Sequence, residues 1–397
     1  MRKLIAVLVL GLMSTSLSGC IDLVDGPLGP VGREGSYVVD VDRILPELLT
    51  YLAETYEAQG QSTLARTLIR RDRARPPAAV SAQVLESVPL IHATDLHRLG
   101  VRGQGTSVLV LDAFSTPIAD GAVVSHGELV SEIVWAVAPE ATVYQVDIRD
   151  IAAFLDTRHP ELVQALHNYD PTDVETLRVA IGLGLGVALA IQDEVELPMA
   201  AVNVSIGSGS KSGGLFARRC PRISANRWID AFVQALLDAN VLVIASAGNE
   251  GPQGGYGREG WPACDPNVVS VAATWDTGSL PFNSGCETIG IDTLTCYSNR
   301  AAFTDLAAPG SRVSTVSTMY QFMTDSAMAL LIQDGTSWAA PHVAGGVALL
   351  HSGLGTVSAN AIYGALRTTG HPVFDPTTGV TIPRLDVASA FVHLRRQ

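Results

Sequence analysis

Three residues that together could activate a hydroxyl group lie far apart along the 397-residue chain: Asp112, His126 and Ser337. A serine hydroxyl is too weak an acid to attack a carbonyl group unaided. An imidazole must accept its proton and later pass that proton to the leaving group. A carboxylate can hold the imidazole in one tautomer and stabilise its protonated form. The set therefore indicates nucleophilic catalysis, provided that the fold brings the three side chains together.

Ser337 stands near the start of a run of small and apolar residues, GTSWAAPHVAG over residues 335–345. A Gly-Thr lead followed by apolar residues at helical spacing predicts that Ser337 lies in the first turn of a helix. Unpaired backbone N–H groups and the positive end of the helix dipole favour negative charge there. Attack on a carbonyl creates an oxyanion, for which the side chain of Asn249 and the backbone N–H of Ser337 are candidate donors.

The motif around Ser337 and the order of the three groups resemble those of the subtilisin-like serine peptidases, the subtilases. Their nucleophile motif reads GTSxAAPHVAG, with Trp338 here at the variable position, and their groups follow the order Asp, His, Ser. The resemblance covers about residues 85–395. It implies a serine endopeptidase that hydrolyses peptide bonds through an acyl-enzyme, with Asp112, His126, Ser337 and Asn249 as catalytic residues.

The resemblance also implies how a polypeptide substrate would bind. An extended substrate would add backbone hydrogen bonds to the exposed edge of the segment 203–207. The residues expected to line the substrate pocket are Ser205, Ile206, Gly207, Ala245, Ser246, Ala247 and Gly248. The runs WPA at 261–263 and APG at 308–310 match two later landmarks of the family.

The chain departs from the family pattern around Asp112 and His126. Ala113 and Phe114 follow Asp112 where the family has a small hydroxyl residue and Gly, and Glu128 stands where it has Thr. Asp112 and His126 are only 14 positions apart, so a loop that binds substrate or calcium in typical members is expected to be missing. No metal site is predicted and no cofactor is required, while calcium use is left open.

Apolar runs of strand length alternate with helical patterns along the main part of the chain. The expected strands are 106–111, 142–148, 201–207, 241–245, 268–272 and 303–306, and the expected helices are 126–137, 173–194, 227–239, 359–367 and the one that begins near 337. This alternation predicts an α/β fold with a doubly wound, mostly parallel sheet and helices on both faces. A ligand site is then expected beyond the carboxyl ends of the strands.

The N-terminus carries export signals. Two basic residues precede an apolar run, 4–13, that is too short to span a bilayer, which predicts a signal peptide over residues 1–19. The ending LSGC at 17–20 resembles the bacterial lipobox and implies lipid on Cys20; an ordinary signal peptide is the alternative. Ile21, in place of Asp, favours the outer membrane. The protein is thus expected to be exported and lipid-anchored to the cell envelope, on its periplasmic or surface side.

Between the signal and the peptidase domain, expected over residues 85–397, lies a segment of tether and helix, 20–84. Apolar residues at helical spacing from Ile44 to about Ile69 predict one or two helices. The segment would be either a propeptide, as the family resemblance implies, or a membrane-proximal spacer. Cleavage near Arg75 would release the catalytic domain from the membrane.

Cysteine count and charge add two expectations. Apart from Cys20 four cysteines remain, which suits an oxidising compartment. Of their three pairings, we favour Cys220–Cys264 and Cys286–Cys296. The chain has 26 basic and 39 acidic residues, so it lacks the positive charge that nucleic-acid binding requires. The expected partners are a polypeptide substrate and a membrane, and the expected state is a monomer.

Several alternatives stay open at this point. The chain could be a non-catalytic lipoprotein that binds polypeptide, or an esterase, although Ser337 lacks a Gly-x-Ser-x-Gly elbow. Asp120 and Asp147 are alternative partners for His126. The run GLGLG at 182–186 resembles a dinucleotide-binding loop but lies in a helical pattern. His342 is expected to pack within its helix, and the remaining histidines form no metal-binding pattern.

Overall fold

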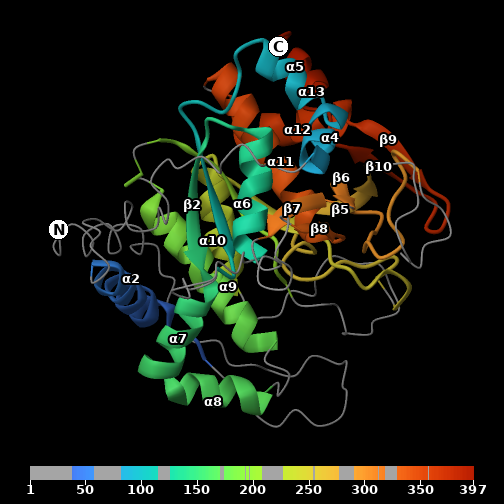
Figure 1. Ribbon diagram of the computed structural model, residues 1–397. Helices are drawn as coiled ribbons and strands as arrows, with labels where there is room; N and C mark the ends of the chain where they lie inside the picture. The colour runs from blue at the N-terminus through green and yellow to red at the C-terminus, as the bar shows by residue number, and fades with distance from the viewer. Residues whose placement is uncertain are drawn as a thin grey trace.

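The protein is described by a computed structural model (Figure 1). The structure describes residues 38–57, 82–114, 126–169, 174–192, 194–195, 197–207, 227–253, 255–276, 290–311, 313–317, 329–355 and 357–397. The statements below concern this part of the chain.

An eight-stranded sheet forms the centre of the fold, with strand order β2-β1-β3-β4-β5-β6-β10-β9. Its strands are β1 (Ser107–Asp112), β2 (Thr142–Asp147), β3 (Met199–Val204), β4 (Leu242–Ser246), β5 (Val269–Trp275), β6 (Leu306–Ser311), β9 (His371–Asp375) and β10 (Val380–Arg384). Neighbouring strands are parallel except for β9 and β10. The predicted doubly wound, mostly parallel sheet is confirmed.

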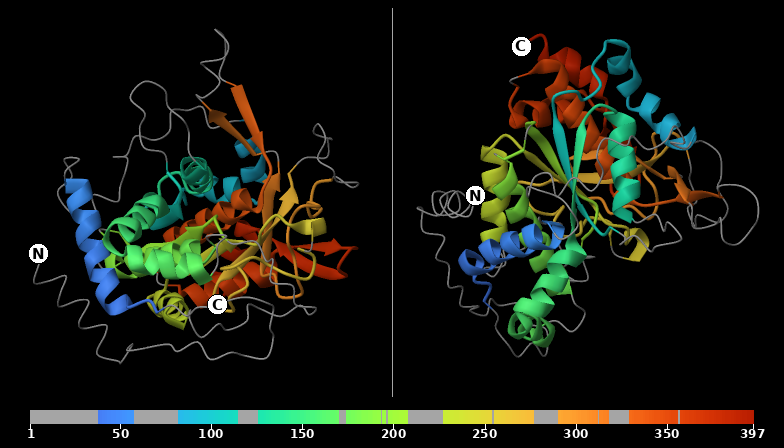
Figure 2. Two further views of the ribbon diagram at one scale, coloured as in Figure 1. Left: turned by 90° about the horizontal axis from the view of Figure 1, so that it is seen from below. Right: turned by 60° about the vertical axis from the view of Figure 1, so that its left-hand side comes forward.

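Helices cover both faces of the sheet because its central strands are apolar on both sides (Figures 1 and 2). The helices are α2 (Val41–Glu57), α4 (Ala82–Leu90), α5 (Ala93–Arg98), α6 (His126–Val137), α7 (Ile148–Arg158), α8 (Pro160–Tyr169), α9 (Val174–Ile191), α10 (Arg227–Asp238), α11 (Thr336–Leu354), α12 (Ala359–Thr369) and α13 (Val387–Leu394). In β1, Val108 and Val110 belong to the core shared with α6 and α11, whereas Leu109 and Leu111 belong to the core shared with α7, α9 and α10. This alternation follows the two-residue period of a strand.

Helix α11 places Ser337. It is buried along most of its length and packs on α6 and on strands β3 to β6. Gly345 allows this close approach, because a Cβ atom there would lie 2.7 Å from a Val137 side-chain atom. The helix begins at Thr336, so Ser337 lies in its first turn, as predicted.

The glycine run 182–186 lies inside helix α9, where it serves packing. A Cβ atom at Gly182 would lie 2.5 Å from Trp228, and one at Gly184 would lie 2.5 Å from Leu111. The glycines let α9 approach α10 and β1 closely. A phosphate-binding loop needs a turn after a strand, so the dinucleotide hypothesis loses its basis.

Helix α2 packs against the main body of the protein, next to α7 and α9 (Figure 2). Its buried apolar side chains are Ile44, Leu45, Leu48, Leu49 and Leu52. One or two helices were expected from Ile44 to about Ile69; α2 accounts for this pattern as far as Glu57, and the rest of it lies outside the described residues. The domain boundary at 84 and 85 falls within α4 and stays a prediction.

Other elements were not expected. The sequence did not predict helices α7 and α8, the pair β9 and β10, or the separate two-stranded sheet of β7 (Val313–Ser317) and β8 (Ala329–Gln333). Strand β6 begins at Leu306, where the strand 303–306 was expected to end. The displacement has a physical cause, because residues 301–304 form a turn: the Thr304 N–H donates to the Ala301 carbonyl (3.1 Å), and the Ala301 N–H donates to Thr304 Oγ1 (2.8 Å). Among the described helices, none has the length and apolarity to cross a bilayer.

Candidate active site

A cavity of about 440 Å³ opens at the carboxyl ends of β1, β3 and β4. Asp112 ends β1, Ser205 follows β3, and Ser246 ends β4. The lining residues are Asp112, Ala113, His126, Leu177, Ser205, Ile206, Gly207, Ser246, Gly248, Asn249, Glu250, Gly260, Trp261 and Ser337. All four residues expected to be catalytic therefore meet at one cavity, on the side of the sheet where ligands bind in α/β folds.

Asp112 holds His126. The carboxylate is fully buried, and its Oδ1 lies 2.7 Å from His126 Nδ1. The same oxygen accepts a hydrogen bond from the backbone N–H of Ala113, at 2.7 Å. The alternative partner Asp147 instead caps helix α7 and pairs with Arg149, at 2.7 Å, and Asp120 lies outside the described residues.

The Asp112 carboxylate also sets the charge state of His126. Burial favours the neutral imidazole and works to lower its pKa. The hydrogen bond and the negative charge of Asp112 act in the opposite direction and outweigh burial, so the pKa of His126 is raised above its usual value. The pair thus stabilises the protonated imidazole that forms when His126 accepts a proton.

Ser337 is hydrogen-bonded to the loop that follows β3. Its Oγ donates a hydrogen bond to the carbonyl oxygen of Ser205 (2.9 Å), and Ser205 Oγ donates to the carbonyl oxygen of Ser337 (2.8 Å). Ser337 Oγ is therefore not bonded to His126 in this conformation. Catalytic hydrogen bonds are often long or poorly aligned without substrate and tighten when substrate binds.

Thr336 orients the side chain of Asn249. Asn249 Oδ1 accepts hydrogen bonds from the N–H of Thr336 (2.8 Å) and from its hydroxyl (3.0 Å). A backbone N–H can only donate, so the amide oxygen must be the atom that faces Thr336. The NH₂ group of Asn249 is then left to donate elsewhere. Gly248, with φ +105°, forms the turn and donates its N–H to Thr336 Oγ1 (3.1 Å).

Asn299, which the sequence did not single out, fastens the turn that carries Asn249. Its Oδ1 accepts from the N–H groups of Glu250 (2.9 Å) and Gly251 (3.0 Å). Its Nδ2 donates to the Ala247 carbonyl (3.1 Å) and to the Glu250 carboxylate. Asn299 is fully buried. Nothing in its sequence neighbourhood distinguishes it from an ordinary turn residue.

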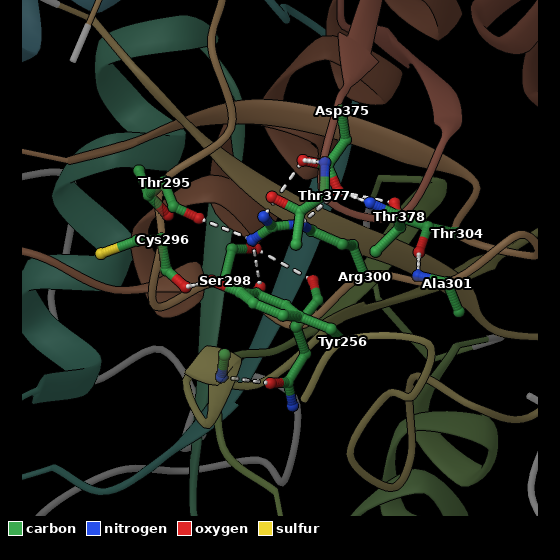
Figure 3. Close-up of polar contacts among 12 residues, drawn as sticks. Tyr256, Thr295, Cys296, Ser298, Arg300, Ala301, Thr304, Asp375, Thr377 and Thr378 are labelled. Carbon is green, nitrogen blue, oxygen red and sulfur yellow. Dashed lines mark hydrogen bonds and ion pairs between the residues drawn. The ribbon is translucent and has the colours of Figure 1, made fainter. Parts of the chain in front are cut away.

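Arg300 in turn fixes the segment around Asn299 (Figure 3). Its buried guanidinium makes two hydrogen bonds to Asp375 of β9, at 2.8 and 3.1 Å, and lies over the ring of Tyr256 at 4.1 Å. It also donates to the carbonyl oxygens of Thr295 and Ser298. The unexpected β9–β10 pair thus supports the turn at the cavity through Arg300 and Asn299.

The residues expected to form the substrate pocket divide into two groups. Lining the cavity are Ser205, Ile206, Gly207, Ser246 and Gly248. Ala245 and Ala247 are fully buried and do not line it. Four further lining residues were not predicted to form the pocket, although Trp261 belongs to a run that matches the family: Leu177, Glu250, Gly260 and Trp261.

His342 is buried in α11. Its Nδ1 lies 2.7 Å from the Trp338 carbonyl oxygen and its Nε2 lies 2.7 Å from Ser87 Oγ. Burial lowers the pKa of His342 to about 4, so the ring is neutral at pH 7. It is a packed helix residue, as expected. Within the described ranges, no group of three or more His, Cys, Asp or Glu side chains is arranged to hold a metal.

The cysteine predictions fall largely outside the structure. Cys264 is buried, but the favoured partner residues Cys220 and Cys286, and the expected lipid site Cys20, lie outside the described residues. The pairs Cys220–Cys264 and Cys286–Cys296 therefore stay predictions.

Two curated proteins are similar to parts of the chain. Subtilisin DY from Bacillus licheniformis is 32% identical over 131 residues, which make up 33% of this chain and 40% of the relative. Subtilisin-like proteinase Mp1 from Magnaporthiopsis poae is 30% identical over 142 residues, which make up 36% of this chain and 30% of the relative. The match thus spans less than half the length of either relative.

Two solved structures are similar at low identity. The Prenylagaramide maturation protease PagA is 18% identical, with a TM-score of 0.49 over 76% of this chain and 98% of that chain. A cold adapted subtilisin-like serine proteinase is 16% identical, with a TM-score of 0.44 over 72% of this chain and 90% of that chain.

The model of the subtilase family matches residues 124–382, more than half of the chain. The matched range contains His126, Asn249 and Ser337 but begins after Asp112, whose place beside His126 comes from the geometry. On the strength of the family match, the chain belongs to the subtilases.

Proposed function

We propose that the protein is a serine endopeptidase that hydrolyses peptide bonds through an acyl-enzyme on Ser337. The observation that carries the proposal is the 2.7 Å contact between Asp112 Oδ1 and His126 Nδ1 at a cavity that Ser337 and Asn249 also line. A carboxylate, an imidazole, a hydroxyl and an amide at one cavity are the groups that acyl transfer requires.

In the proposed reaction, a peptide lies along residues 205–207 in extended form. Ser337 Oγ turns from the Ser205 carbonyl toward His126, gives its proton to Nε2 and attacks the scissile carbonyl carbon. The NH₂ group of Asn249 and the backbone N–H of Ser337 donate hydrogen bonds to the oxyanion. The C–N bond then breaks as His126 returns the proton to the leaving amine. Water, activated by His126, finally hydrolyses the ester.

Export and lipid anchoring through Cys20 complete the proposal, and they rest on the sequence of residues 1–20. The similarity to subtilisin DY over 131 residues supports export. Metabolic labelling with a fatty acid would test the anchor. Wild-type protein should incorporate label and partition into membranes, whereas Cys20→Ala should do neither. Label retained by Cys20→Ala would overturn the lipid site.

The competing proposal is a subtilase-fold protein that binds polypeptide without cleaving it. The observation in its favour is that Ser337 Oγ donates its hydrogen bond to the Ser205 carbonyl oxygen and not to His126. Two measurements on purified protein separate these functions: cleavage of casein or a peptide library followed by mass spectrometry, and labelling by a fluorophosphonate, which reacts with activated serine hydroxyls.

If the protein is a peptidase, wild-type protein should cleave peptides and react with the fluorophosphonate. Ser337→Ala should show neither cleavage nor labelling, and His126→Ala should lose most of both activities. Equal, near-zero turnover and labelling in wild type and Ser337→Ala would instead support the binding protein.

A further inference from the structure

Trp338, the residue directly after Ser337, contacts the catalytic imidazole. The rings of Trp338 and His126 have centroids 5.0 Å apart and planes inclined at 41°. The indole is buried, with 2% of Trp338 exposed, whereas 35% of the His126 side chain is exposed. A buried ring therefore forms a wall on one side of a partly exposed imidazole.

The position of the indole is itself fixed by its surroundings. The backbone of Trp338 is held at both ends: its backbone N–H donates to the Gly335 carbonyl (3.1 Å), and its carbonyl oxygen lies 2.7 Å from His342 Nδ1. The indole also lies close over Gly335, since a Cβ atom there would be 3.4 Å from Trp338 Nε1. With its backbone held in the first turn of α11 and its ring buried, Trp338 has little room to change side-chain conformation.

The imidazole needs such a support because it has few others. Among the described residues, the one polar partner of the His126 side chain is Asp112, through Nδ1. A single hydrogen bond at one ring atom sets a distance but still permits the ring to tilt about that atom. The indole restricts the tilt, which keeps Nε2 directed toward the cavity. An aromatic ring also stabilises a cation placed against it, and His126 becomes a cation when it accepts a proton.

We infer that Trp338 is a positioning residue that holds the imidazole of His126 and stabilises its protonated form. The contact can be tested without any enzyme activity, whereas its consequence for catalysis rests on the proposed function.

The first experiment is a fluorescence titration in Ser337→Ala, which prevents self-digestion. A protonated imidazole quenches a neighbouring indole more strongly than a neutral one. The contribution of Trp338 is the emission of this protein minus the emission of its Trp338→Phe variant. This contribution should become smaller as the pH drops through the pKa of His126. The same component should not titrate when His126 is changed to Phe, and its midpoint should move to lower pH in Asp112→Asn. A Trp338 component that is independent of pH, or that still titrates in His126→Phe, would overturn the contact.

The second experiment measures kcat/KM against pH for variants of Trp338. Trp338→Ala should lower kcat/KM about 3- to 30-fold, the range expected for losing an aromatic–cation contact, and should shift the acidic limb to lower pH. Trp338→Phe, which keeps a ring, should stay within about threefold of wild type. The matched control is Trp228→Phe, which changes a buried tryptophan of α10 on the other side of the sheet and should leave the profile unchanged.

The two experiments distinguish a failure of the proposed function from a failure of the positioning role of Trp338. If wild-type protein cleaves no peptide while the Trp338 emission titrates with His126, the proposed function fails and the contact stands. If wild-type protein cleaves peptide and Trp338→Ala reproduces the wild-type rate and pH profile, the positioning role is wrong.

Discussion

The two sides of the cavity are built differently. On the side of Asn249, the turn 247–251 is held by hydrogen bonds from two other parts of the chain, Asn299 and Thr336, both fully buried. On the side of His126, one carboxylate and one aromatic ring hold an imidazole that is 35% exposed. One side is fixed by a network of hydrogen bonds, and the other by two separate contacts.

The difference fits the role that we propose for each side. Hydrogen-bond donors stabilise an oxyanion best when they already point at it and need no rearrangement. An imidazole that accepts and returns a proton must instead reach two partners, the hydroxyl and the leaving group. We therefore expect variants of the Asn249 side to lose activity together with stability, and variants of the His126 side to lose activity alone.

The largest effect is expected for Asp112→Asn. An amide at this position would leave His126 in the wrong tautomer, and kcat should fall about 10⁴-fold. The matched control is Asp147→Asn, one strand away in register with Asp112. An asparagine keeps the helix cap but loses the ion pair with the half-exposed Arg149, so stability should fall by less than about 1 kcal/mol while kcat stays near the wild-type value. Steady-state kinetics and urea denaturation of both variants check the prediction, and equal losses of kcat would contradict it.

A smaller loss is expected for Asn249→Ala, which removes the side-chain donor of the oxyanion site. Turnover should fall about 10²–10³-fold with little change in KM, because the oxyanion exists only in the transition state. Thr336→Val, which keeps the Asn249 side chain but removes one of its two hydrogen bonds, should cost less. A rise in KM with unchanged kcat in Asn249→Ala would show that this amide binds substrate and does not stabilise the oxyanion.

The sequence indicated the proposed catalytic residues better than the residues that hold them in place. Ser337 and Asn249 stand in short patterns that can be interpreted locally, and the strand that ends at Asp112 is a continuous apolar run. Asn299 acts on Ala247 from 52 positions away, and Asn249 accepts from Thr336 87 positions away. No local pattern records such distant hydrogen bonds, because they depend on how strands and loops are arranged in space.

The same reasoning applies to the fold. Alternating strands and helices predicted the parallel sheet, since each pattern has its own period. The order of strands, and the antiparallel pair β9 and β10 at one edge of the sheet, depend on pairings between distant segments. The Arg300–Asp375 contact illustrates this limit, because neither residue stands in a pattern that indicates the other.

Asn299→Ala tests whether the Asn249 side of the cavity depends on the hydrogen bonds of the buried Asn299. The change leaves the backbone N–H groups of Glu250 and Gly251 without their partner and removes one of the two donors to the Ala247 carbonyl, which keeps the N–H of Gly260. Stability should fall by about 2–3 kcal/mol and kcat by about tenfold, because the turn with Asn249 loosens. Asn299→Asp keeps the two accepting bonds, loses the donating ones and places a charge beside Glu250. If stability falls in Asn299→Ala but kcat stays at the wild-type value, Asn299 supports the fold without orienting the oxyanion site.

The pH dependence of kcat/KM tests the His126 side of the cavity. Of the predictions, this one has the smallest expected effect near neutral pH. His126 must be neutral to accept a proton, and Asp112 raises the pKa of its imidazole above the usual 6.5. The rate should therefore be full above that raised pKa and fall about tenfold per pH unit below it. Asp112→Asn removes the charge that raises the pKa, so the residual activity of this variant should persist to lower pH. The control is His92→Gln. His92 does not line the cavity, and its ring contacts Asp386, the N-cap residue of α13. A midpoint that does not move in Asp112→Asn would mean that the acidic limb reports a group other than His126.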